Sequence, residues 1–80
     1  MEKSDLKEVL EFLQEYESNL QGTIEVYEQS MFINNMPNKK DDIHSQEIYD
    51  KAKQLQGKTE KKIIKINELI EKVKGELENE

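Results

Sequence analysis

The chain has 80 residues, of which 34% are hydrophobic and 38% are charged, and its formal net charge is −6. A domain this small with so few apolar residues buries little surface as an isolated monomer. It contains no Cys, which excludes disulfides and thiolate metal sites as sources of stability. Association with another chain is therefore the expected way to stabilise it.

Composition also narrows the classes of function. The apolar runs are too short to span a membrane, and the N-terminal sequence MEKSDLKEVLEF lacks the apolar region of a signal peptide. Every basic side chain is Lys, whereas Arg is the residue that recognises phosphate and guanine through paired hydrogen bonds. We expect a cytoplasmic protein with no cofactor, no direct nucleic-acid binding and no membrane association.

The first segment has the periodicity of a helix from Ser4 to about Ile33. An apolar row recurs every seven residues, and a second row follows it by three places. The rows are Leu6, Leu13, Leu20 and Tyr27, then Val9, Tyr16, Thr23 and Ser30, flanked by Leu10, Ile24, Met31, Phe12 and Val26. Ser4 is the predicted N-cap, with Asp5 and Glu8 close to the positive end of the helix.

Residues 34–42, NNMPNKKDD, interrupt this periodicity. They contain the only Pro of the chain, and Pro37 disfavours helical geometry at Met36. A second helix is expected from about 43 to 78, with Asp41 or Asp42 as its N-cap. Its inward rows are Tyr49, Ile63, Ile70 and Leu77, then Ala52, Ile66 and Val73, with Ile48, Leu55 and Leu69 beside them.

These elements predict an all-α fold, a coiled-coil-like antiparallel hairpin that forms one domain over residues 1–80. The combined apolar stripe is wider than one partner helix covers, so two hairpins are expected to dimerise into a four-helix bundle. The predicted partner or dimer interface comprises Leu6, Leu10, Leu13, Tyr16, Leu20, Tyr27, Met31, Phe32, Met36, Tyr49, Leu55, Ile63, Ile66, Ile70 and Val73. Met31, Phe32, Ile33 and Met36 cluster near the turn and either close that end of the bundle or form a docking surface.

The tripeptide Leu-Gln-Gly occurs twice, ending at Gly22 and at Gly57. Glycine often ends a helix in the left-handed conformation. Here the seven-residue rows continue in phase past both glycines, which predicts that each lies inside an uninterrupted helix. Folding about the loop is expected to bring the two glycines to about the same level of the hairpin.

Charge is divided unevenly between the two helices. The first 33 residues contain two Lys and eight acidic residues, whereas the segment from Ile43 contains eight of each. A stripe of lysines, Lys51, Lys58, Lys65 and Lys72, is expected to pair with acids of the first helix or of a second hairpin. Alternatively, the acidic helix occupies a basic cleft, as nucleic-acid-mimicking inhibitors do.

No group of side chains predicts catalysis or a metal centre. His44, Asp41 and Glu47 share a helical face, but one His with two carboxylates is more typical of a solvated helix start than of a metal site. Ser45 is adjacent to His44 and points away from it on a helix, so the two do not form a nucleophile–base pair.

The stretch HSQEIYDKAKQL, residues 44–55, is similar to the S-Q-E-L-D signature of the small sporulation phosphatases, two-helix hairpins that act on aspartyl-phosphate response regulators. The matching residues are Ser45, Gln46, Glu47 and Ile48. Tyr49 stands in the place of the family's Asp, and Asp50 follows one position later. On a helix, that shift rotates the carboxylate by about 100°.

The length of the hairpin and its central turn are also similar to the small helical proteins of type VII secretion. Met36-Pro37-Asn38 stands where that family has its Trp-x-Gly turn. The two resemblances imply alternative functions as a phosphatase or as a partner protein of a secretion system. The main expectation is a non-enzymatic interaction module that self-associates and binds or blocks a partner protein.

Overall fold

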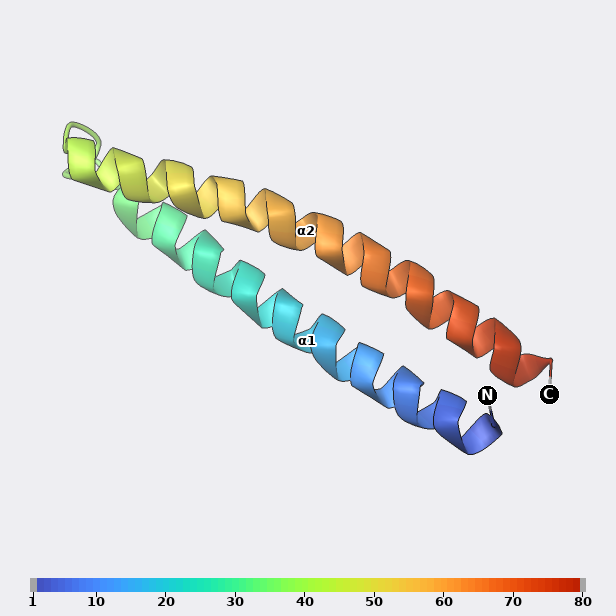
Figure 1. Ribbon diagram of the computed structural model, residues 1–80. Helices are drawn as coiled ribbons and strands as arrows, with labels where there is room; N and C mark the ends of the chain where they lie inside the picture. Colours follow the sequence, from blue (N-terminus) through green and yellow to red (C-terminus); the bar gives the residue numbers. More distant parts are fainter. Residues whose placement is uncertain (1, 80) are drawn as a thin grey trace.

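The computed structural model describes residues 2–79 and consists of two helices, α1 (Lys3–Asn34) and α2 (Ile43–Glu78), which run antiparallel along each other (Figure 1). The chain reverses at one end, and both termini lie at the other. The Cα atoms extend over 59 × 14 × 14 Å. No strand occurs between residues 2 and 79, so the predicted all-α hairpin is confirmed.

A thin row of apolar side chains between the helices forms the core. The buried members are Leu6, Leu20, Ala52, Ile63 and Ile70, and no side chain among residues 2–79 is less than 2% exposed. The predicted inward rows of α2 account for its three buried apolar residues. On α1, Tyr16 was predicted to face inward but is 45% exposed. It lies at the edge because the row of Leu6 and Leu20 occupies the centre of the contact.

The two helices begin in different ways. Asp42 caps α2, because its Oδ1 accepts the N–H of His44 at 3.0 Å and its Oδ2 accepts the hydroxyl of Ser45 at 3.3 Å. Partial desolvation raises the pKa of Asp42, but hydrogen bonds from His44 and Ser45 outweigh it and lower that pKa below its ordinary value. The N-cap of α1 is Glu2, without a side-chain hydrogen bond, so the prediction that Ser4 caps this helix is wrong.

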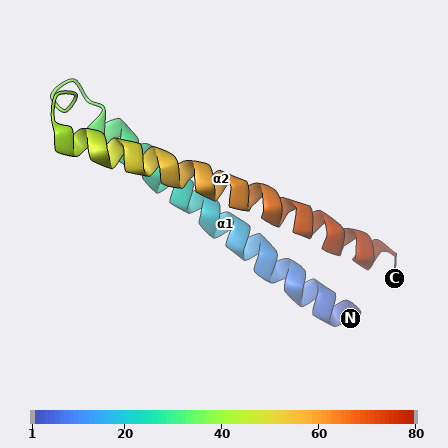
Figure 2. The same cartoon turned by 45° about the horizontal axis from the view of Figure 1, so that its top comes forward.

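The loop folds back on the first turn of α2 (Figure 2). The N–H of Lys39 donates to the carbonyl of Met36 at 2.8 Å, and the N–H of Asp42 donates to the carbonyl of Lys39 at 3.1 Å. Gln46 Nε2 then donates to the carbonyl of Lys40 at 3.0 Å, which joins the loop to α2. Ser45, on the same turn, is only 4% exposed. The start of α2 therefore packs against the loop.

Both helices continue through their Leu-Gln-Gly glycines, as predicted, and no residue from 2 to 79 has a positive φ. Gln56, beside Gly57, donates to Glu28 Oε1 at 3.4 Å across the hairpin. The common level of the two glycines stays a prediction.

Candidate interaction surface

We call one long side of the hairpin the polar face. It carries the hydrogen bond between Gln56 and Glu28, which joins the two helices. The outer row of α2 on this side consists of Lys53, Glu60, Asn67 and Lys74, all exposed. This row is polar, and the exposed apolar residues beside this side are Phe32, one turn from Glu28, and Ile64, one turn from Glu60.

The opposite side carries apolar side chains from both helices. We call this set the apolar face: Phe12, Tyr16, Val26 and Ile33 of α1, with Ile48, Leu55 and Leu69 of α2. Phe12 and Val26 are 60% and 62% exposed. Multiples of seven separate the members within each helix, except for Tyr16, which lies one turn after Phe12. Helical geometry therefore aligns each set along one edge.

A groove near the turn shows that both edges belong to the same side. Val26, Tyr27 and Ser30 of α1 and Ile48, Ala52 and Leu55 of α2 line it, with His44, Glu47 and Lys51 at its rim. Its lining is mainly apolar. The groove thus joins the exposed edges of the two helices across the hairpin axis.

Two polar residues interrupt the apolar face halfway along the hairpin. Asn19 stands between Phe12 and Val26 in the row of α1, and Lys62 stands between Leu55 and Leu69 in that of α2. Both side chains are exposed. Val26 and Leu55 line the same groove, and counting seven residues back along α1 and forward along α2 places Asn19 and Lys62 within about one helical turn of each other.

The two rims of the apolar face differ in charge. Glu8 and Glu15 follow the outer edge on α1, and the lysine stripe follows the outer edge on α2. The ion pairs among residues 2–79 join Lys65 to Glu68 at 4.0 Å and Lys74 to Glu71 at 3.9 Å, both within α2 and exposed. Such pairs contribute little stability. The prediction that the stripe pairs with acids of the first helix is wrong for this hairpin.

The structure places the predicted interface residues in three environments. Leu6, Leu20, Ile63 and Ile70 are buried between α1 and α2. The half-buried members are Leu10, Leu13, Tyr27, Met31, Tyr49, Leu55, Ile66 and Val73. Tyr16, Phe32 and Met36 are exposed. The predicted set omitted the outer row of the apolar face, namely Phe12, Val26, Ile33, Ile48 and Leu69, although the same seven-residue spacing identifies it.

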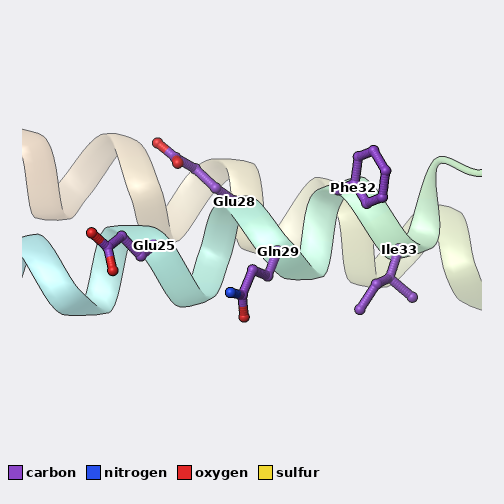
Figure 3. Close-up of a pocket in the computed structure, with 5 residues that line it drawn as sticks. All are labelled: Glu25, Glu28, Gln29, Phe32 and Ile33. Atoms are coloured by element: carbon purple, nitrogen blue, oxygen red, sulfur yellow. The ribbon is translucent and has the colours of Figure 1, made fainter.

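Two further apolar side chains near the turn, Phe32 and Ile43, are 70% and 77% exposed. Phe32 also borders an open depression on α1. Figure 3 shows its lining residues, Glu25, Glu28, Gln29, Phe32 and Ile33, all from one helix and pointing to both sides of it. These side chains do not converge on a common point, which a catalytic site requires.

The residues that resemble the phosphatase signature have structural contacts. Ser45 and Gln46 form the hydrogen bonds to Asp42 and to the loop that start α2. Tyr49 is half-buried in the inward row, and Asp50 is exposed. Within residues 2–79, no three His, Asp or Glu side chains come together as metal ligands.

Comparison with protein-family models, with curated proteins and with solved structures gives no match. Neither α1 nor α2 is long and apolar enough to cross a membrane. The surface of the hairpin is therefore the basis for inferring its function.

Proposed function

We propose that the protein is a non-enzymatic interaction module, an acidic helical hairpin that self-associates through its apolar face and binds or blocks a partner protein. The observation that carries this proposal is the apolar face, rows of exposed and half-buried apolar side chains on both helices beside a core of five buried apolar residues among residues 2–79. Exposed apolar patches of this kind mark surfaces that are covered in a complex.

The energetics favour covering the apolar face with a second chain. Complete burial of a large apolar side chain contributes about 1.5–3 kcal/mol. Two copies contribute fourteen such side chains, each partly buried already, and their remaining burial is worth roughly 10–20 kcal/mol. Association costs about 4–15 kcal/mol. The gain therefore matches or exceeds the cost.

The dimensions of the hairpin agree with this estimate. A face of 59 by 14 Å has a projected area of roughly 830 Å², comparable to the ~800 Å² that each partner buries in a stable protein complex. Contact along the whole length of the hairpin is needed to reach that area. A second elongated helical chain provides such contact, whereas a small ligand or a short peptide does not.

The acidic surface of α1 is the second part of the proposal. Glu11, Glu25 and Glu28 lie outside the apolar face and are exposed. They remain accessible when the apolar face is covered, and they favour a partner with a basic surface. Self-association and partner binding would thus use different sides of α1.

Sedimentation equilibrium tests self-association. At micromolar concentration, we expect a mass near twice the 9.5 kDa of the chain. Val26→Asp places a charge in the apolar face and should weaken the dimer at least 100-fold, which corresponds to about 2.7 kcal/mol. Ile64→Asp is the matched control, because Ile64 is 60% exposed but lies outside the apolar face. A monomeric wild-type chain that unfolds cooperatively would contradict the proposal.

A further inference from the structure

We infer that the second copy packs on the apolar face with its α2 against α1 and with both turns at the same end of a four-helix bundle. This inference rests on the self-association proposed above and adds the arrangement of the two hairpins. The charges at the rims of the apolar face and the position of Lys62 carry it.

Two symmetric arrangements bring two apolar faces together. With the two-fold axis parallel to the helices, each α1 contacts the α2 of the other copy, neighbouring helices are antiparallel and the turns lie at one end. With the axis perpendicular to the helices in the plane of contact, α1 contacts α1, α2 contacts α2, and the turns lie at opposite ends. The apolar side chains allow either arrangement, so polar residues must decide between them.

The rim charges favour the parallel axis. With turns at opposite ends, the lysine stripe of one copy faces the same stripe of the second copy. Like charges placed opposite each other suppress an association. With turns at the same end, Glu8 and Glu15 of each copy face Lys72 and Lys65 of the other, the half of the lysine stripe near the chain termini. Lys72 has no acidic partner among residues 2–79 of its own chain and gains one there.

Lys62 provides an independent reason. It lies near the middle of α2, which runs from Ile43 to Glu78, and it belongs to the apolar edge itself. A perpendicular axis through the centre of the hairpin places Lys62 against Lys62 of the second copy inside the interface, where two unpaired charges are costly. The parallel axis places it near Asn19 of the second copy, whose side-chain oxygen accepts a hydrogen bond from an ammonium group.

Pulsed dipolar EPR spectroscopy on spin-labelled chains distinguishes these arrangements. The chain has no Cys, so one introduced Cys gives a single labelling site. Asn38→Cys labels the loop, and Lys3→Cys labels the opposite end; both positions are exposed. We would measure each labelled protein alone and a mixture of the two, in which Asn38→Cys and Lys3→Cys chains pair.

We expect distances below roughly 30 Å for each labelled protein alone, because helices in a bundle lie about 10 Å apart. The mixture should add a distance of roughly 50 Å, the length of a helix of 36 residues. Long distances for each protein alone with a short distance in the mixture would overturn the arrangement and leave self-association intact. Absence of dipolar coupling together with a monomeric mass would overturn both.

Discussion

Both long faces of the hairpin consist of residues from α1 and α2, but one carries mainly polar side chains and the other mainly apolar ones. On the polar face, Gln56 and Glu28 hydrogen-bond across the helices, and the outer row of α2 is polar and exposed. On the apolar face, Phe12 and Val26 expose most of their surface. One side therefore carries mainly polar side chains, and the other carries rows of apolar ones.

A small core beside an apolar face is the physical basis of the proposed self-association. Five buried apolar residues provide a small core, and small domains commonly gain further stability from another chain. Buried polar groups add no penalty, because every buried side-chain nitrogen or oxygen of residues 2–79 has a hydrogen-bond partner. Thr59, for example, donates to the carbonyl of Leu55 at 2.9 Å. The exposed apolar edge is therefore where the remaining stabilisation is available.

The largest expected effect comes from replacing a core residue, and the adjacent surface residue serves as its control. Ile63 is 8% exposed between the helices, whereas Ile64 is 60% exposed outside the apolar face. Ile63→Ala should lower the free energy of unfolding by about 2–5 kcal/mol, because it leaves a cavity. Ile64→Ala should change it by less than about 0.5 kcal/mol. Urea unfolding followed by circular dichroism measures both; equal losses would show that the packing is wrong.

A smaller effect is expected at the capped start of α2. Asp42→Ala removes the acceptor for His44 and Ser45 and should lower the melting temperature by a few degrees. The neighbouring Asp41→Ala serves as the control. Because the folded state lowers the pKa of Asp42, its contribution is present above the unfolded pKa and is lost as the pH falls through the folded pKa. A melting temperature of Asp42→Ala that falls with acid as steeply as that of the wild type would contradict this role.

Replacing either glycine by Ala should change the stability by a smaller amount and in the opposite direction. A Cβ added at Gly22 or Gly57 meets no atom within 4 Å, and both residues have helical backbone angles. Each change to Ala should therefore stabilise the protein by about 0.4–1 kcal/mol, chiefly by restricting the unfolded chain. Thermal melts of the two single variants and the double variant measure this. Destabilisation at Gly57 would contradict the register of α2.

For the phosphatase alternative we expect no effect at all. Asp50 is exposed, and its neighbours Ser45 and Gln46 are engaged in starting α2. The wild-type protein and Asp50→Asn should leave the lifetime of phosphorylated response regulators from the host unchanged. Faster dephosphorylation by the wild type that Asp50→Asn abolishes would replace the interaction proposal with catalysis.

Local signals in the sequence were sufficient to predict the two helices. The seven-residue rows and Pro37 define the helices and the loop, and the unbroken phase predicts continuity through both glycines. The cap of α1 was missed because alternative caps at a helix end differ by only about 1 kcal/mol. The hydrogen bond of Gln46 to the loop was missed because periodicity does not encode it.

The interaction surface was predictable only in part. Spacing identifies the outer rows that include Phe12 and Val26 on α1 and Leu55 on α2. Which edge of the stripe stays open depends on how each helix is rotated about its own axis when the two pack. That rotation places Tyr16 at the edge and half-buries Glu17 on the other side. A tertiary contact therefore decides which of the predicted residues remain available to a second chain.

Solvent paramagnetic relaxation of side-chain methyl groups tests the difference between the two faces most directly. With a soluble paramagnetic probe and protein at high micromolar concentration, the methyl groups of Val26 and Ile48 should relax nearly as slowly as those of buried Ile63. The methyl groups of Ile64 and Ile43, which lie outside the apolar face, should relax fast because both residues are exposed. Relaxation of Val26 and Ile48 as fast as that of Ile64 would contradict the account, since it would show that the apolar face remains open to water.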